Sequence, residues 1–260
     1  MPIEKIKNSL RDENLQNSFL TTLINDVDPF EIARRLNEFS TDDKIRIFHF
    51  LDNESKRQAL LYETDIDSRL EIQETLDRDY LANLLDEMAE DEATDLIQEL
   101  PSDTQEDILS KMEAQDAEVI KDLIQYGEET AGGLMTPEFN KIKWNQPAAE
   151  IFTKIKQESG SYMHPYFYVV DEQNKLLGFF KLRDLLNAQA SAIAKEFIRP
   201  ETPKIAINDP CEKVANVMGQ EHLSILPVVD ENNVIQGVVT FDDVIRVMED
   251  IASEDIYTMV

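Results

Sequence analysis

Carboxylates dominate the reactive side chains of this 260-residue sequence. Asp and Glu total 53, against 25 Lys and Arg, three His and one Cys, and the formal net charge is −28. In the stretch Asp-Glu-Ala-Thr-Asp, Asp91 and Asp95 stand four residues apart, so a helix would present both on one face. Clustered carboxylates with few thiols or imidazoles suit hard divalent cations such as Mg²⁺ or Ca²⁺. The alternative interpretation is an acidic helix N-terminus that is simply solvated.

The excess of negative charge is localised along the chain. Residues 1–135 hold 34 acids and 13 bases, residues 136–200 hold 7 and 9, and residues 201–260 hold 12 and 3, which gives −21, +2 and −9. A compact domain with a charge of −21 repels itself unless cations or a basic partner screen it. The same charge repels phosphate backbones and anionic lipid, which argues against nucleic-acid binding.

Signals for catalysis and for a zinc site are missing from the sequence. The three histidines, His49, His164 and His222, are widely separated and form no ligand pattern with Cys211. No Ser-His-Asp order, P-loop or nucleophile elbow is present, so we expect no enzyme. A single cysteine excludes an internal disulfide and fits a reducing compartment. No apolar run approaches ~20 residues and the N-terminus lacks a signal-peptide core, so we expect no membrane span.

The first half of the chain predicts short helices at regular spacing. Small polar or acidic residues typical of helix N-termini recur about every 12 residues, at Thr41, Asn53, Thr64, Asp77, Glu90, Ser102 and Gln115. Earlier, Asp28 and Pro29 predict a cap followed by a first-turn proline. None of these short helices can bury its apolar face alone, so residues 1–130 are predicted to stack as an all-α superhelical repeat domain.

The second half is an internal duplication of an α/β unit. Two glycines and a proline in residues 129–139 end the helical pattern. Residues 135–151 match 198–214 at an offset of 63, and residues 168–186 match 227–245 at an offset of 59. Each copy predicts a strand, a helix opened by a proline, two strands joined by an Asp-Glu-x-Asn turn, and a final helix. The prediction is therefore a β-α-β-β-α unit, present twice.

This duplicated unit resembles a pair of CBS domains, and residues 28–260 as a whole resemble the cytosolic part of MgtE-type magnesium transporters. The most specific stretch is YGEETAGGLMTP at residues 126–137, followed by PVVDENNVIQGVVTFDDVI at 227–245 and SEDI at 253–256. A CBS pair alone would indicate little, because such pairs regulate many enzymes, channels and transporters. The order of acidic helical domain, AGGLMTPE junction and tandem CBS domains carries the resemblance.

The resemblance implies a domain plan and a function. Residues 1–130 would be the MgtE N-type domain, residues 131–197 and 198–248 the two CBS domains, and residues 249–260 the start of a helix that connects to a transmembrane pore domain absent from this chain. The chain would then lie at the cytoplasmic face of the cell membrane, covalently continuous with that pore. It would form a homodimer through its CBS domains and sense Mg²⁺ to gate magnesium transport.

The resemblance also implies metal ligands. In the Asp-Glu-Ala-Thr-Asp stretch the implied ligands are Asp91, Glu92 and Asp95. The other implied ligands lie in the second CBS domain and the connecting helix: Asp230, Asp243, Glu254 and Asp255. Mg²⁺ bound between acidic faces would replace repulsion with bridging attraction and compact the chain. Each site needs only one or two direct carboxylates, because Mg²⁺ keeps much of its water. Arg246 and Ile251 stand where the family can carry acids, which argues against a full set of sites on the connecting helix.

CBS pairs also bind adenosine nucleotides, with a Gly-hydrophobic-x-Ser/Thr-x-x-Asp signature whose carboxylate accepts from the ribose hydroxyls. The second copy fits this signature with Thr240 and Asp243. The first copy has Lys181 at the hydroxyl position and keeps Asp184, with Arg183 beside it to face phosphate. ATP or another adenine nucleotide is therefore a predicted ligand, although Asp243 cannot easily serve ribose and metal together.

Two alternatives to cation sensing remain open at this point. The chain could be an adenine-nucleotide-sensing CBS regulatory module on a helical-repeat scaffold, with the acidic domain simply solvated. It could also be a helical-repeat scaffold for a basic partner, which an exposed apolar groove in the repeat would favour. The clustered acids in DEATD and SEDI favour cation sensing over both.

Overall fold

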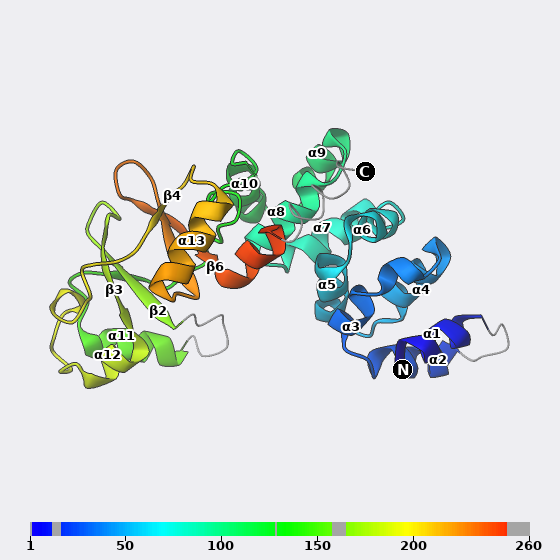
Figure 1. Ribbon diagram of the computed structural model, residues 1–260, viewed down its shortest axis with the longest axis horizontal. Coiled ribbons are helices and arrows are strands. Elements are labelled where there is room, and N and C mark those ends of the chain that lie inside the picture. The colour runs from blue at the N-terminus through cyan, green and yellow to red at the C-terminus, as the bar shows by residue number, and fades with distance from the viewer. Residues whose placement is uncertain (1, 12–16, 128, 158–164, 249–260) are drawn as a thin grey trace. The chain divides into compact units, whose positions relative to one another are not determined.

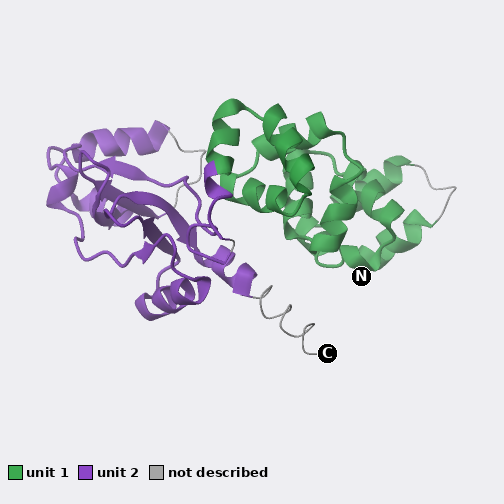
Figure 2. Cartoon of the chain, turned by 90° about the horizontal axis from the view of Figure 1, so that it is seen from above, with its two compact units in different colours: residues 1–121 green, residues 122–260 purple. Residues whose placement is uncertain are grey.

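The computed structural model describes residues 2–11, 17–127, 129–157 and 165–248. Two predicted ligands, Glu254 and Asp255, together with Ile251, lie outside these residues. The chain divides into two compact units, residues 1–121 and 122–260 (Figure 2). Among the described residues, no helix combines the length and the apolar character that crossing a membrane requires.

The N-terminal unit is built from short helices, shown from blue to green in Figure 1. They are α1 (Pro2–Leu10), α2 (Asn17–Asn25), α3 (Pro29–Ala33), the 3-10 turn η1 (Leu36–Glu38), α4 (Thr41–Phe50), α5 (Glu54–Glu63), α6 (Ile66–Gln73), α7 (Arg78–Asp86), α8 (Glu90–Gln98) and α9 (Ser102–Lys111), and α10 (Ala114–Leu123) follows at the unit boundary. From α4 onward, every predicted helix start lies within about two residues of the observed one, because the capping residues that define the starts are local signals.

Side-chain caps explain why these helices begin where they do. Asp28 accepts a hydrogen bond from the amide of Phe30, with Pro29 at the first helical position. Ser40, Asn53, Asp65 and Asp77 do the same for α4, α5, α6 and α7. Each such cap stabilises its helix by roughly 0.5–2 kcal/mol, which is a large contribution for a helix of eight to ten residues.

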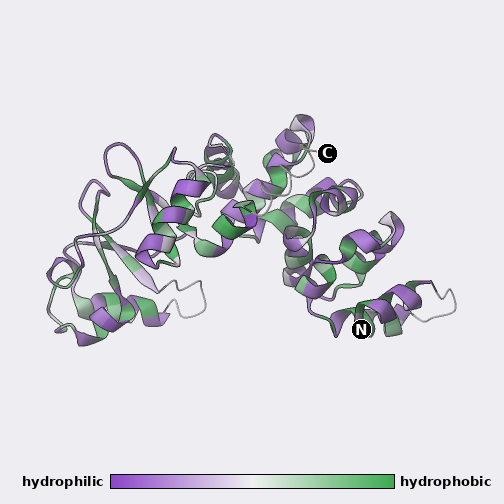
Figure 3. Cartoon of the chain, in the orientation of Figure 1, coloured by the Kyte–Doolittle hydropathy of each residue, from purple (hydrophilic) through white to green (hydrophobic). Residues whose placement is uncertain are grey.

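Helices α2 to α7 and α9 form two rows, in which a helix packs on the one two places further along the chain. Helix α2 packs on α4 and α4 on α6, while α3 packs on α5, α5 on α7 and α7 on α9. The apolar faces meet inside the stack, where Phe48, Leu60 and Leu81 are fully buried, and the polar faces point outward (Figure 3). The predicted repeat of helical pairs is confirmed.

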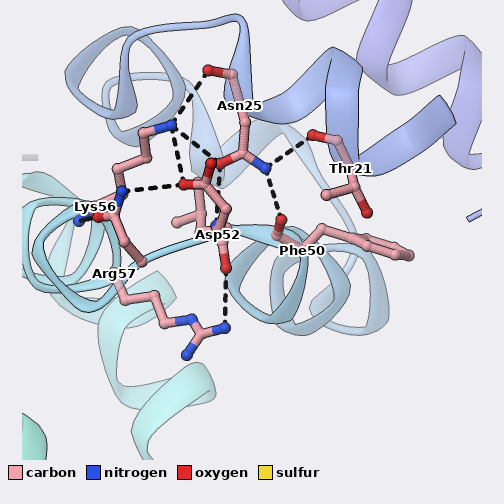
Figure 4. Close-up of polar contacts among 8 residues, drawn as sticks. Thr21, Asn25, Phe50, Asp52, Lys56 and Arg57 are labelled. Carbon is pink, nitrogen blue, oxygen red and sulfur yellow. Dashed lines mark hydrogen bonds and ion pairs between the residues drawn. The ribbon is translucent and has the colours of Figure 1, made fainter. Parts of the chain in front are cut away.

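Asn25 at the end of α2 connects the ends of three helices (Figure 4). Its amide nitrogen donates to the carbonyls of Thr21 and Phe50, both at 2.8 Å, and its amide oxygen accepts from the backbone N–H of Asp52 at 3.0 Å. The Lys56 ammonium completes the group, 3.2 Å from the amide oxygen of Asn25 and 3.1 Å from the Asp52 carboxylate. One side chain thereby joins α2 to the end of α4 and the start of α5.

The second unit contains two copies of the predicted β-α-β-β-α arrangement. The first comprises β1 (Lys141–Lys143), α11 (Ala148–Gln157), β2 (Tyr166–Val170), β3 (Leu176–Lys181) and α12 (Leu182–Asn187), with a 3-10 turn η2 (Ala194–Glu196) after it. The second comprises β4 (Ile205–Ala206), α13 (Cys211–Glu221), β5 (Ile225–Val229), β6 (Ile235–Thr240) and the helical residues 241–248. In each sheet the first strand is parallel and the third antiparallel to the central one.

The two copies are joined at their hairpin turns and along one sheet face. In each turn the aspartate, Asp171 or Asp230, accepts from backbone amides two and four residues ahead at 2.8–2.9 Å. Asn174 and Asn233 adopt positive φ of 60° and 64°, the conformation that Asn tolerates in such turns. Backbone hydrogen bonds then link the two turns, and apolar residues of both sheets form a shared buried cluster. The predicted Asp-Glu-x-Asn turns are confirmed.

Candidate functional site

Helix α8 presents the predicted acidic cluster of the N-terminal unit. Glu90, Asp91 and Glu92 occupy its first turn, where the positive end of the helix dipole favours carboxylates, and Asp95 follows one turn later. The opposite face of the helix carries Ala93, Leu96 and Ile97, all buried. Asp91, Glu92 and Asp95 are consequently half-buried rather than fully solvated. The helix brings the three predicted ligands to one end of one element.

A buried arginine of α6 anchors the C-terminal end of α8. The Arg69 side chain is only 8% exposed and forms an ion pair with Glu99, the residue that ends α8. Its guanidinium also donates to the carbonyls of Leu61, Tyr62 and Thr64 at 2.7, 2.7 and 2.8 Å. This arginine therefore fixes the position of the acid-bearing helix relative to α5 and α6, and nothing in its sequence context singled it out.

The two predicted ligands in the second CBS copy lie at opposite ends of the β5–β6 hairpin. Asp230 is in the turn after β5, whereas Asp243 follows β6, whose last residue Thr240 pairs with the first residue of β5. Five residues of strand separate the two ends, about 16 Å at 3.3 Å per residue. One ion cannot be shared by both carboxylates, and one oxygen of Asp230 already serves the turn.

Asp243 is partly buried beside a hydroxyl group and a guanidinium group. Its carboxylate accepts from the Thr240 hydroxyl and is 3.9 Å from the Arg246 guanidinium. Burial raises the pKa of Asp243 above its usual value, although the Thr240 hydroxyl and the Arg246 charge act in the opposite direction. Across the described parts of the chain, no three Asp, Glu, His or Cys side chains converge in a way that could hold a metal ion. The metal roles of Asp91, Glu92, Asp95, Asp230 and Asp243 stay predictions.

In the first CBS copy Asp184 pairs with one cationic side chain, and two further cationic residues lie near it in sequence. The Asp184 carboxylate accepts from the backbone N–H of Lys181 at 2.9 Å and from the Arg199 guanidinium at 3.0 and 3.1 Å. The Lys181 ammonium lies 4.8 Å from the centre of the Tyr166 ring, and Arg183 is exposed on the same helix turn. Burial opposes ionisation of Asp184, but the hydrogen bonds from Lys181 and Arg199 outweigh it and lower the pKa of this carboxyl.

Arg199 was not among the residues predicted from the sequence. It occupies the position equivalent to Thr136 under the offset of 63 residues, and both positions make an isolated two-residue bridge to the third strand of a sheet. The signal that could have identified it was the net positive charge of residues 136–200, which the sequence interpretation assigned to Lys181 and Arg183 alone.

The glycine of each nucleotide signature has a clear packing role. A Cβ atom on Gly178 would lie 2.5 Å from the carbonyl oxygen of Arg199, and one on Gly237 would lie 2.6 Å from that of Thr136. Both glycines allow a neighbouring chain segment to pair with the sheet at that point. The close approach of the neighbouring chain segment thus explains the signature glycine. It does not explain the other residues predicted to bind nucleotide, which are Lys181, Arg183, Asp184, Thr240 and Asp243.

The final helices of the two CBS copies expose apolar side chains. Leu186 of α12 is 62% exposed, and Phe241 and Ile245 in the helical residues 241–248 are 41% and 42% exposed. Leu186 and Ile245 are equivalent positions under the offset of 59 residues. Both copies therefore leave an apolar helix surface uncovered within this chain.

The N-terminal unit contains a pocket between its helices. A pocket of about 260 Å³ lies between α4, α5 and α7, and its lining includes His49, Arg57, Asp77 and Tyr80. The Arg57 guanidinium in this pocket is already hydrogen-bonded to Glu54 and to the Tyr80 hydroxyl at 2.8 and 2.9 Å.

Comparisons with known families agree with this architecture. Residues 15–129 match the MgtE intracellular N domain, and residues 131–191 and 194–250 match the CBS domain. The chain is thus an MgtE N domain followed by a CBS pair, and the predicted fold class is confirmed.

Two similar proteins of known name are magnesium transporters. This chain is 35% identical over 141 residues to the magnesium transporter MgtE of Thermus thermophilus and 32% identical over 143 residues to that of Enterococcus faecalis. These matches cover 54% and 55% of this chain but only 31% and 32% of the relatives, so the aligned part spans about a third of their length.

Two solved structures match nearly the whole chain. The crystal structure of the cytosolic domain of the Mg²⁺ channel MgtE in complex with ATP has a TM-score of 0.85 and 25% identity, covering 95% of this chain and all of that one. The soluble part of a magnesium transporter has a TM-score of 0.75 and 26% identity, with 96% of each chain covered. This protein is homologous to the MgtE magnesium transporters and has the fold of their cytosolic domain, and the relatives named here are transporters rather than enzymes.

Proposed function

We propose that this chain is the Mg²⁺-sensing regulatory region of a magnesium transporter, and that bound Mg²⁺ draws its acidic surfaces together to gate transport. The observation that carries the proposal is the pair Asp91 and Asp95 on one face of α8, in a domain that matches the MgtE N domain. Both acids are half-buried, in a segment with a net charge of −21. Bridging by a divalent cation would relieve the repulsion between such a segment and other acidic surfaces of the chain.

Each Mg²⁺ would use one or two carboxylates and keep most of its water. This requirement is compatible with α8, where two or three acids share one helix end. It is also compatible with Asp243, whose carboxylate pairs with Thr240 and Arg246. The regulatory region would act at the cytoplasmic face of the membrane, continuous with a pore domain outside this chain.

Small-angle scattering of the chain during Mg²⁺ titration tests this function. Millimolar Mg²⁺ should reduce the radius of gyration, and NaCl at equal ionic strength should do so much less, because screening is weaker than bridging. The double variant Asp91→Ala/Asp95→Ala should move the midpoint to higher Mg²⁺. Its matched control is Asp103→Ala/Asp107→Ala, which removes two exposed acids with the same spacing from α9. A midpoint that moves equally in both variants would mean that α8 holds no specific site.

The homodimer belongs to the same proposal. Leu186, Phe241 and Ile245 leave apolar surface on the final helix of each CBS copy, and a second copy of the chain is the occupant that would cover it. Sedimentation should show a dimer at micromolar concentration, with or without Mg²⁺. A monomer at high micromolar concentration under both conditions would contradict it.

A second candidate function is binding of an adenine nucleotide in the first CBS copy. Arg199 pairs with Asp184, Lys181 and Arg183 are its neighbours in sequence, all four belong to the net-positive segment 136–200, and the structure of 0.85 TM-score described above was solved with ATP. Asp184 would accept from ribose hydroxyls, and the cations would face the phosphates. Calorimetry with ATP and AMP should detect binding that Asp184→Ala weakens more than Lys181→Ala. No heat at millimolar nucleotide would mean that Asp184 and its neighbouring cations have a structural role only.

A further inference from the structure

Arg199 forms an ion pair with Asp184, the carboxylate that would bind the ribose of a nucleotide. Its Nη2 atom lies 3.0 and 3.1 Å from the two oxygens of Asp184, and this ion pair is partly shielded, with side chains 45% and 21% exposed. The second oxygen of Asp184 also accepts from the backbone of Lys181. These donors use three of the roughly four acceptor positions of the carboxylate, so a ribose that hydrogen-bonds to both oxygens must displace the guanidinium.

The backbone of Arg199 is held against the sheet, and its side chain extends from there over the Phe179 ring to Asp184. Arg199 and Phe179 exchange two backbone hydrogen bonds, at 2.7 and 3.2 Å, which hold residue 199 against β3. Gly178 permits this approach, since its Cβ position is only 2.5 Å from the Arg199 carbonyl oxygen. The guanidinium carbon lies 5.8 Å from the centre of the Phe179 ring. The ion pair with Asp184 is thus made by one long side chain that extends from a fixed point of the sheet.

The second copy lacks this arginine. Thr136 occupies the equivalent position and exchanges two backbone hydrogen bonds with Val238, both at 2.9 Å. Asp243, the equivalent of Asp184, takes a hydroxyl from Thr240 and lies 3.9 Å from Arg246, a residue of its own helix. The sheet bridge is therefore shared by both copies, whereas a guanidinium that reaches the carboxylate from the bridging residue is specific to the first. The backbone bridge alone does not explain why position 199 carries an arginine.

We propose that Arg199 is a specificity-determining residue that makes the first CBS copy select nucleotides by their phosphate charge. Without a nucleotide its guanidinium neutralises Asp184. On binding, the ribose hydroxyls replace it at Asp184, and the released guanidinium pairs with phosphate beside Lys181 and Arg183. Adenosine must break the ion pair without compensation, whereas AMP recovers part of it and ATP recovers most. This inference rests on the proposed binding of an adenine nucleotide.

Calorimetric titration of the full chain with ATP, AMP and adenosine tests the proposal. Arg199→Met keeps an unbranched side chain over Phe179 but removes the charge. We expect adenosine to bind this variant about threefold more tightly, the scale of a partly exposed ion pair. ATP should bind about tenfold more weakly, the scale of one lost charge-assisted contact. The ratio of ATP to adenosine affinity should then fall by about thirtyfold, while Arg199→Lys should keep most of that ratio.

Lys213→Met is the matched control. It removes one positive charge and one ion pair, with Asp209 at 2.8 Å, on α13 of the other CBS copy. It should leave the ratio of ATP to adenosine affinity unchanged. If Arg199→Met, shown by circular dichroism to be folded, keeps the wild-type ratio while both ligands still bind, the selection proposal is wrong and nucleotide binding stands. If neither ATP nor adenosine binds wild type, Arg199→Met or Arg199→Lys at millimolar concentration, the proposed nucleotide function fails and the selection proposal fails with it.

Discussion

Replacing Arg69 with Met should destabilise the helical unit more than any exposed charge replacement. The guanidinium donates to three main-chain carbonyls and pairs with Glu99, and both side chains are well buried, at 8% and 17% exposure. Removing one partner of a buried pair costs about 3–5 kcal/mol, because the remaining charge stays buried without compensation. Met occupies a similar space, so little of this cost comes from packing. We expect a loss of about 4 kcal/mol in the free energy of unfolding.

Urea unfolding measures this loss, and hydrogen exchange assigns it to a region. The amides of α6 and α8 should lose protection first, because Arg69 joins these helices through Glu99. In thermal unfolding the same loss corresponds to a decrease of about 10–20 °C in the melting temperature of a unit of this size.

Arg46→Met provides the comparison for the Arg69 variant. Arg46 is 42% exposed and lies 3.5 Å from Asp43, an arrangement worth less than about 1 kcal/mol. If Arg69→Met costs no more than Arg46→Met, the buried pair does not hold α8 in place, and the reasoning is refuted.

Three further predictions concern stability and titration. Asn25→Ala should cost about 2 kcal/mol in urea unfolding, because it leaves the carbonyl of Phe50 and the amide of Asp52 without their partner. Gly178→Ala should destabilise the second unit by more than about 2 kcal/mol, since its Cβ would meet the Arg199 carbonyl, whereas Gly219→Ala on α13 should stabilise by about 0.5–1 kcal/mol in the same assay because nothing lies near its Cβ. Asp243 has a raised folded-state pKa, so its contribution to stability is full below the unfolded-state pKa and is lost as pH rises through the folded-state pKa. NMR titration should show Asp243 protonating at a higher pH than a model aspartate, and Mg²⁺ should lower that value only if Asp243 is a ligand.

Local signals in the sequence predicted the fold well. Caps such as Asn53 and Asp77 and the turns around Asp171 and Asp230 act through neighbouring backbone amides, so their effect can be read within a few residues. The duplication was equally visible, because two copies of one unit must repeat its turn and strand pattern. Arg69 and Arg199 were missed because their partners lie 30 and 15 residues away, and an arginine has no local mark that shows whether it will be buried.

The acids show why a candidate site is harder to predict than a fold. A carboxylate can cap a helix, close a turn, neutralise a cation or bind a metal, and the sequence shows the same residue type in each case. Asp77 caps α7, Asp230 closes a turn and Asp184 pairs with Arg199, so each has part of its hydrogen-bonding capacity in use. The cost of bringing Mg²⁺ to an acid includes the contacts that the acid already makes, which is why Asp230 is a poorer candidate than its charge suggests. The acids in the first turn of α8 differ in one respect, because the positive end of the helix dipole favours their charged form.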